Sequence, residues 1–184
     1  MRAQNKSSTG VEVVFHENDI LVSKTDARGF ITYASRDFLN FSGYKEKDLI
    51  GRSHNVVRHP DMPRSIFKII WNQISSGYEN FSYVLNLTKS GNFYWALLHV
   101  TPSFDDHGKI IGYHSTYRSP SRDSIQSVIV PLYRELMECE NSQSCLNSGA
   151  ESGVRFLNDM LLSSGFEYNG FILSLEKDSG LFFS

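Results

Sequence analysis

The order of apolar patterns along the chain constrains the fold more than any other feature. Two short strand-like runs come first, at residues 20–25 and 30–34, with a turn at 26–29 between them. Helical patterns follow as far as Ser75, and three more strand-like runs then lie at 79–87, 93–103 and 109–118. A strand pair, a helical crossover and a three-strand meander predict an α+β domain, with a five-stranded antiparallel sheet and helices on one face.

The helical crossover contains one strong helix and weaker ones. Phe38 and Phe41 suit a short helix that Gly43 closes, because glycine accepts the left-handed conformation. The main helix is predicted to begin at Pro63, a residue favoured in a first turn, and to end near Ser75. Its apolar face is formed by isoleucines four residues apart: Ile66, Ile70 and Ile74.

The chain divides into three parts. Residues 1–18 are polar and predict a flexible N-terminal segment or a loose cap, residues 19–120 are expected to form the sheet-containing domain, and residues 121–184 a helical C-terminal extension. Pro131 is expected to kink the first helix of the extension. That helix either folds back on its own sheet or contacts a partner or a second copy, through an apolar stripe of Ile125, Val128, Ile129, Leu132 and Leu136.

Composition excludes several classes of protein. A formal net charge of −2, without clustered Lys and Arg, does not suit a nucleic-acid-binding surface. The apolar runs are too short to cross a bilayer and the polar N-terminus lacks a signal peptide, so we expect a cytoplasmic protein. The two cysteines, Cys139 and Cys145, form no Cys-x-x-Cys pattern and predict reduced thiols.

Residues 52–63 hold the densest cluster of charged and amide groups. Pro60 favours extended backbone at His59, so Arg58 and His59 should point to different sides. The helix that starts at Pro63 offers free N–H groups, which suit a phosphate, and Arg58 can bind a pyrophosphate through two hydrogen bonds. The alternative is a surface loop with an ion pair between Arg58 and Asp61.

This cluster also carries a family resemblance. The run Asn55-Val56-Val57-Arg58-His59-Pro60-Asp61-Met62-Pro63 resembles the signature of PAS domains in Aer-type aerotaxis receptors. Further matches occur in the family's order, and the resemblance covers roughly residues 19–135: Phe41-Ser42-Gly43-Tyr44, Gly91-Asn92-Phe93-Tyr94-Trp95, Val100-Thr101-Pro102 and Ile111-Gly112-Tyr113. It implies that residues 19–120 are a PAS sensor domain.

The resemblance implies noncovalent FAD, whose redox state reports oxygen or respiratory status. It also implies a stand-alone PAS protein that signals in trans to a methyl-accepting chemotaxis-type transducer, with a homodimer possible and no membrane insertion of its own. Asn86 interrupts an apolar run, and a buried amide needs partners that a ligand can supply. The family often has Asn where this chain has Ser35, and Trp where it has Asn80. The predicted cofactor-binding residues are Ser35, His54, Asn55, Arg58, His59, Asp61, Phe67, Trp71 and Asn86.

Three rival interpretations remain. A haem-based gas sensor would take its axial ligand from one of four histidines, His54, His59, His99 or His114. A cofactor-free PAS module would bind only proteins. A flavin enzyme is the weakest rival, because the chain has no Gly-x-Ser-x-Gly elbow, phosphate loop or histidine pair at zinc-site spacing. We therefore predict neither catalytic residues nor a metal site.

Overall fold

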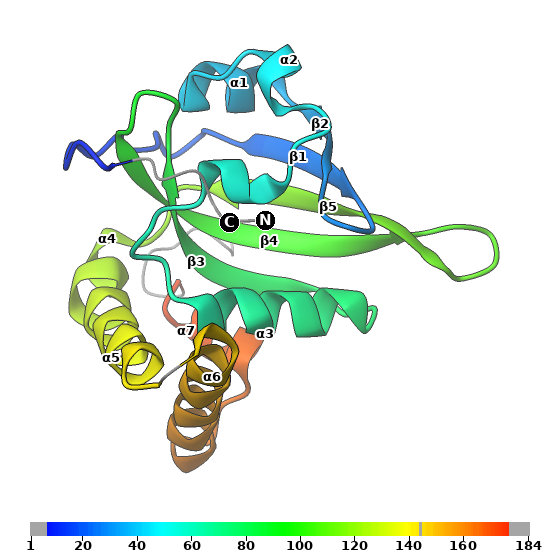
Figure 1. Cartoon of the computed structure of the whole chain (residues 1–184). Helices are drawn as coiled ribbons and strands as arrows, with labels where there is room; N and C mark the ends of the chain where they lie inside the picture. Colours follow the sequence, from blue (N-terminus) through cyan, green and yellow to red (C-terminus); the bar gives the residue numbers. More distant parts are fainter. Residues whose placement is uncertain (1–6, 144, 177–184) are drawn as a thin grey trace.

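The computed structural model describes residues 7–143 and 145–176. Its centre is a five-stranded antiparallel sheet in the order β2-β1-β5-β4-β3 (Figure 1). The strands are β1 Leu21–Asp26, β2 Ile31–Ala34, β3 Asn80–Leu87, β4 Phe93–Phe104 and β5 Ile110–Arg118. The α+β fold predicted from the order of patterns is therefore confirmed.

The crossover between β2 and β3 covers the inner face of the sheet (Figure 1). It contains α1 (Arg36–Ser42), α2 (Glu46–Leu49), the 3-10 helix η1 (His54–Val57) and α3 (Arg64–Ser75). Ile66, Ile70 and Ile74 of α3 are all buried, as their four-residue spacing predicted. Residues 52–63, the charged and amide cluster of the sequence, contain the short helix η1, which Ser53 caps through its side chain.

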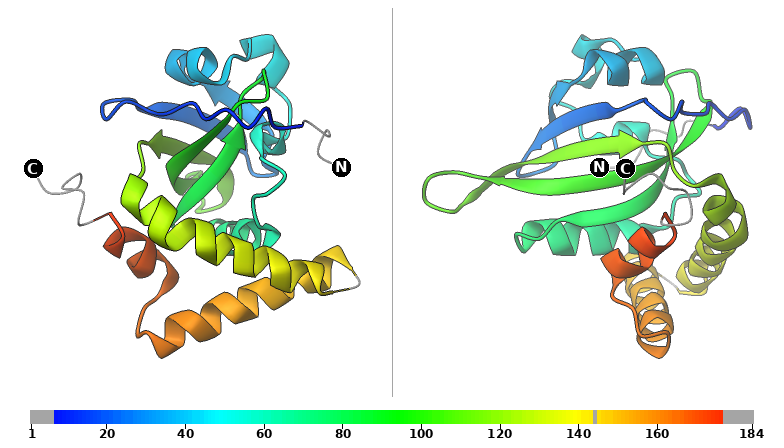
Figure 2. Two further views of the ribbon diagram at one scale, coloured as in Figure 1. Left: turned by 90° about the vertical axis from the view of Figure 1, so that its left-hand side faces the viewer. Right: turned by 180° about the vertical axis from the view of Figure 1, so that it is seen from behind.

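The C-terminal extension packs beside β3 and α3 (Figure 2). It comprises α4 (Arg122–Ser124), the π-helical η2 (Ile125–Ile129), α5 (Val130–Asn141), α6 (Leu146–Ser163) and α7 (Tyr168–Ser174). Four of the five residues of its apolar stripe are buried within the chain, so the structure shows the helix folded back on its own domain: Ile125, Ile129, Leu132 and Leu136. In the described residues no helix combines the length and apolar character needed to span a membrane.

The outer edge of β3 is closed by side chains and backbone from three other segments. The backbone N–H of His59 donates to the carbonyl of Leu85 at 3.3 Å. Tyr133 of α5 donates its hydroxyl to the carbonyl of Tyr83 at 2.6 Å. Asn169 of α7 accepts from the N–H of Phe81 at 3.0 Å and donates to the carbonyl of Glu79 at 3.1 Å. The extension therefore completes the hydrogen bonding of an edge strand.

The described part of the N-terminal segment lies against the start of β4, which fits the alternative of a cap. Val13 donates its N–H to the carbonyl of Phe93 at 2.8 Å, and Thr9 donates to Gly91 at 2.9 Å. Phe15 is buried, with its ring centroid 4.4 Å from that of Phe41. Residues 7–15 thus lie along the start of β4, because backbone hydrogen bonds and the buried side chain of Phe15 anchor them. Residues 1–6 lie outside the described part.

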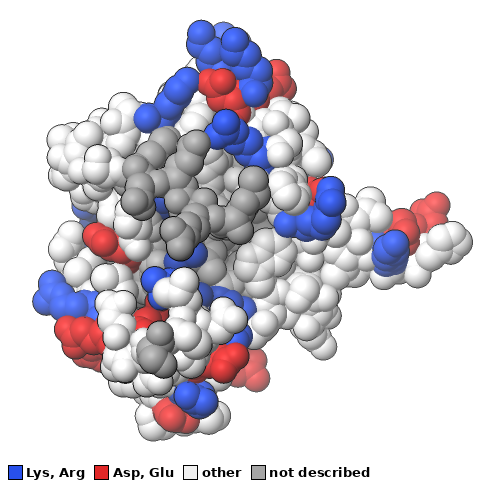
Figure 3. Space-filling model, in the orientation of Figure 1, with Lys and Arg blue, Asp and Glu red and all other residues white. Residues whose placement is uncertain are grey.

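On the face of the molecule shown in Figure 3, Lys and Arg lie among Asp and Glu in several separate groups, with uncharged residues between them. No continuous basic area occupies the described part of this face, in line with the composition.

Candidate ligand-binding cavity

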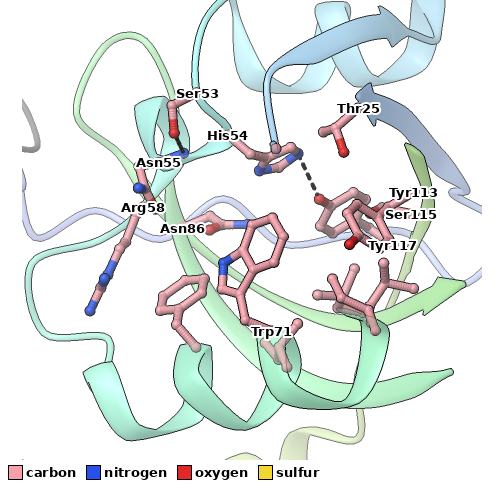
Figure 4. Close-up of a pocket in the computed structure, with 16 residues that line it drawn as sticks. Thr25, Ser53, His54, Asn55, Arg58, Trp71, Asn86, Tyr113, Ser115 and Tyr117 are labelled. Atoms are coloured by element: carbon pink, nitrogen blue, oxygen red, sulfur yellow. Dashed lines mark hydrogen bonds between the residues drawn. The ribbon is translucent and has the colours of Figure 1, made fainter. Parts of the chain in front are cut away.

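A cavity lies between the inner face of the sheet, η1 and α3 (Figure 4). Counted with the solvent at its open side, it encloses about 630 Å³ of empty space. Most of the lining is apolar or aromatic, with hydroxyl, amide and cationic groups at a few points. The lining residues are Thr25, Gly29, Ser53, His54, Asn55, Arg58, Phe67, Ile70, Trp71, Ile74, Asn86, Leu98, Val100, Tyr113, Ser115 and Tyr117.

The sheet side of the cavity follows from strand alternation. Tyr113, Ser115 and Tyr117 occupy alternate positions of β5, so their side chains project to the same face. The neighbouring strands place Thr25 opposite Tyr113 and Val100 opposite Ser115 in register. The antiparallel pairing thus assembles an apolar and hydroxyl-bearing floor from three strands.

His54 joins η1 to this floor. Its Nε2 lies 3.0 Å from the Ser23 hydroxyl and 2.9 Å from the Tyr117 hydroxyl, the second contact being drawn in Figure 4. The imidazole also stacks on the Tyr117 ring, with centroids 6.0 Å apart. Burial lowers the pKa of His54 to about 4, so the ring is neutral at pH 7. The acceptor nitrogen of a neutral imidazole has one lone pair, so Nε2 can accept from one of these two hydroxyls.

Trp71 of α3 closes one side of the cavity. Its indole points into the space between Asn86 and Tyr113 (Figure 4) and meets the Tyr113 ring edge-on, with centroids 5.5 Å apart. Gly29, in the turn between β1 and β2, has φ +81°, and a Cβ there would lie 2.8 Å from Trp71 Cη2. Glycine is therefore required both by the turn and by the close approach of the indole.

Arg58 places a cation at the rim. Its guanidinium lies 4.2 Å from the Phe67 ring centroid and donates to the carbonyl of Met62 at 2.8 Å. Figure 4 shows the side chain running from the cavity toward the start of α3. Burial lowers the pKa of Arg58 to about 10, while the negative charge of Glu140 acts in the opposite direction. Arg58 is therefore cationic at neutral pH.

A family model described as the PAS fold matches residues 11–118, more than half of the chain. The chain belongs to the PAS family. The PAS domain is 37% identical over 120 residues to the aerotaxis receptor of Escherichia coli strain K12, a match that covers 65% of this chain and 23% of the receptor.

Further relatives of this PAS domain are light receptors by name. Phototropin-2 of Oryza sativa is 35% identical over 81 residues, 44% of this chain and 9% of that protein. The solved light-state structure of the blue-light photoreceptor Aureochrome1 LOV shares 30% identity with a TM-score of 0.54, covering 60% of this chain and 89% of that one. The chain thus spans less than a quarter of the curated relatives named here.

The PAS cavity brings together six of the nine residues predicted to bind a cofactor: His54, Asn55, Arg58, Phe67, Trp71 and Asn86. The other three support the scaffold. Ser35 caps α1 by accepting from the N–H of Phe38 at 3.1 Å and also accepts from Val22 at 3.1 Å.

His59 and Asp61 shape the loop before α3. His59 is 6% exposed, and its Nδ1 accepts from the N–H of Asp61 at 3.1 Å. The Asp61 side chain is 69% exposed, with its carboxylate 3.8 Å from His59 Nδ1. Arg58 contacts Met62 and Phe67, so the alternative ion pair between Arg58 and Asp61 is not what the structure shows.

The N-terminus of α3 was expected to bind a phosphate, but its N–H groups have a partner within the chain. Its first N–H groups, those of Arg64 and Ser65, donate to the carboxylate of Glu140 at 3.1 and 2.8 Å. The sequence predicted an anion at this helix end, and the anion present belongs to the chain itself. A ligand phosphate bound there would have to displace Glu140.

Apart from Asn86, the sheet-side residues of the cavity were not predicted. Thr25, Tyr113, Ser115 and Tyr117 all line it, yet only their strands were predicted. The signal available was the alternation of β5 itself, because Tyr113, Ser115 and Tyr117 share a face with no charged residue between them on that face. Among the described residues, no group of three His, Cys, Asp or Glu side chains gathers as a metal site.

Proposed function

We propose that this PAS domain binds a flavin, FAD, and reports its redox state to a signalling partner. The observation that carries the proposal is the makeup of the cavity: apolar and aromatic walls, an amide and hydroxyls at the sheet, and a cation at the rim. A tricyclic ring with one polar edge and a phosphate tail needs those three kinds of surface. The likeness to the E. coli aerotaxis receptor supports the same proposal.

The residues present fit that group. Asn86, Thr25 and Ser115 would hydrogen-bond the polar edge of the ring, and Trp71 and Tyr113 would supply its apolar walls. Arg58 would hold the phosphates at the rim. A bound flavin supplies reversible electron transfer coupled to protonation of its ring nitrogens. Because unpaired buried polar groups cost about 1–3 kcal/mol, the groups facing that edge would re-pair when the redox state changes.

Redox chemistry is proposed over light-driven thiol addition. Blue-light receptors occur among the relatives, so light is the second input to consider. A thiol that adds to a flavin must face the ring. Both cysteines of the chain lie elsewhere, Cys139 in α5 and Cys145 at the start of α6, and neither lines the cavity.

The output is proposed to pass through β5 into the extension. Tyr113, Ser115 and Tyr117 line the cavity, and β5 ends three residues before α4 begins. A methyl-accepting chemotaxis-type transducer, reached in the cytoplasm, is the proposed partner in trans. Hydrogen exchange of oxidised and anaerobically reduced protein should differ over residues 109–136. Identical exchange in both states would remove this route and leave flavin binding intact.

The visible spectrum of the purified protein tests the cofactor. Flavin absorption bands, with FAD recovered after denaturation, are expected. A Soret band would identify a haem sensor, and a colourless protein that takes up no added FAD would identify a protein-interaction module. Arg58→Ala and Asn86→Ala should both release flavin, whereas Arg36→Ala, at an exposed position of α1, should retain it. Full loading of both cavity variants would count against the assigned site.

A further inference from the structure

Glu140, the penultimate residue of α5, is a buried carboxylate at the boundary between the extension and the PAS domain. Its side chain is 5% exposed. It accepts from the N–H of Arg64 at 3.1 Å, and from both the N–H and the hydroxyl of Ser65 at 2.8 Å. It therefore caps α3 from 75 residues away in sequence, at the helix end where a negative charge is stabilised.

Helix α6 is shaped to close over this contact. A Cβ on Gly149 would lie 2.5 Å from the Glu140 carbonyl, and one on Gly153 would lie 2.8 Å from the Ser65 side chain. Because both positions lack a side chain, α6 can pack directly on Glu140 and on the first turn of α3. The carboxylate is thus fixed by α3 on one side and by α6 on the other.

Glu140 also acts on the cavity through Arg58. The guanidinium of Arg58 donates to the carbonyl of Met62, and the Glu140 carboxylate accepts from Arg64 and Ser65, so both charges lie at the N-terminal end of α3. The negative charge of Glu140 there favours the cationic form of Arg58. Arg58 is at the same time the cation at the rim of the cavity, and it stacks on Phe67 in the first turn of α3. The buried Glu140 carboxylate therefore holds the extension on α3 and also partly neutralises Arg58, the cation that would face a ligand.

We propose that Glu140 is a positioning residue that couples the charge of the bound ligand to the hold of the extension on α3. A phosphate at Arg58 is repelled by Glu140, so the Glu140 charge weakens the binding of phosphate-bearing ligands. By reciprocity, such a ligand weakens the cap and loosens α5 and α6. The proposal rests on the proposed flavin site and adds how occupancy of that site reaches the extension.

The test compares three flavins that differ in phosphate content: FAD, FMN and riboflavin. Their dissociation constants are measured on wild-type protein and on Glu140→Gln, which keeps the size and one accepting oxygen but removes the charge. FAD and FMN should bind Glu140→Gln roughly three- to tenfold more tightly, with riboflavin unchanged, because only phosphates meet the lost repulsion. High salt should reduce this difference in FAD and FMN affinity between wild-type protein and Glu140→Gln. Glu138→Gln, an exposed glutamate of the same helix, serves as the matched control and should change nothing.

A second measurement needs no variant. Hydrogen exchange of the Arg64 and Ser65 amides and of α6 should speed up when wild-type protein binds FAD, and should not when it binds riboflavin. If Glu140→Gln binds all three flavins as wild type does, or if FAD and riboflavin leave exchange equal, the coupling is overturned and the flavin site stands. If wild-type protein binds no flavin, the proposed function falls and this inference falls with it.

Discussion

Polar groups on the cavity side of α3 and β3 differ in their surroundings from polar groups on the side of the extension. On the cavity side, Thr25, Asn86 and Ser115 face empty space. On the side of the extension, the polar groups described above are matched within the chain. Glu140 caps α3, Asn169 pairs with the β3 backbone, and Tyr83 donates to the buried Glu176, which also accepts from the N–H of Ser121 at 3.1 Å.

This difference distinguishes the cavity, which can bind a ligand, from the interface between the extension and the PAS domain, which is packed within the chain. Polar groups that line a cavity are available to hydrogen-bond a ligand that enters it. Where partners come from the chain itself, the contact becomes a fixed part of the structure. Glu140 belongs to the second kind, although its charge also reaches Arg58 at the rim of the first.

Removing the Glu140 side chain should destabilise the packing of the extension on α3. Glu140→Ala deprives two amides and one hydroxyl of their acceptor. We expect a loss of about 3 kcal/mol or more in the free energy of unfolding, because each buried donor left without its acceptor costs about 1–3 kcal/mol. Urea denaturation measures it. Glu138→Ala should stay within about 0.5 kcal/mol of wild type, and an equally small loss in both variants would contradict a buried cap.

Lowering the pH should reduce the free energy of unfolding, because His54 beside the cavity resists protonation in the folded protein. Its folded pKa is about 4, below the ordinary value of 6.5, so between these values the unfolded chain takes up a proton that the folded ring resists. Stability should therefore fall as pH drops from 6.5 to 4, by about 2–3 kcal/mol from this group. Urea denaturation at pH 7.0, 5.5 and 4.5 should show a shallower loss for His54→Gln. Some loss should remain, because burial also lowers the pKa of His59 and His114. Equal acid sensitivity of the variant would argue against a buried neutral imidazole.

Two glycine substitutions should change stability in opposite directions. Gly149→Ala places a methyl against the Glu140 backbone and should cost about 1–3 kcal/mol by overpacking. In α7, Gly170→Ala meets no atom within 4 Å and should stabilise the protein by about 0.5–1 kcal/mol through helix propensity. Thermal unfolding of both variants checks the signs. A neutral Gly149→Ala would mean that α6 can move away from α5 at little cost.

The smallest effect is expected at the surface. Lys68 of α3 and Glu151 of α6 form an ion pair at 2.8 Å across the same boundary that Glu140 closes. Since the Glu151 side chain is 55% exposed, Lys68→Ala should cost only about 0.2–1 kcal/mol, and less at high salt. Denaturation at two ionic strengths measures this. A loss as large as that of Glu140→Ala would mean that this exposed ion pair holds the extension on α3 as strongly as Glu140 does.

Sequence reasoning reached the strands and the main helix because their evidence is local. The strand predicted at 79–87 is β3 at Asn80–Leu87, and the helix predicted from Pro63 to Ser75 is α3 at Arg64–Ser75. Apolar spacing and turn residues lie within a few positions of the elements that they define. Asn86 was found for the same reason, as an amide inside an apolar run.

Contacts between distant segments could not be predicted in the same way. Glu140 stands at the start of a polar stretch that indicates a loop, and nothing near it shows that its partners are Arg64 and Ser65. His59 and Asp61 were grouped with Arg58 because they are its neighbours, yet the loop turns their side chains away from the cavity. Both cases concern the direction of a side chain in space, which one-dimensional patterns specify only within regular elements.

The closed edge of β3 has a consequence for the chain while it is being made. The hydroxyl that covers Tyr83 arrives 50 residues later and the amide that covers Glu79 arrives 90 residues later. A ribosome adding 5–20 residues per second needs roughly 5 to 20 s to supply the second of these. During that interval the nascent sheet presents an open strand that other nascent chains can pair with. Neighbouring ribosomes on one message would bring such chains together, so translation speed through residues 120–170 should influence how much of the protein reaches its folded form.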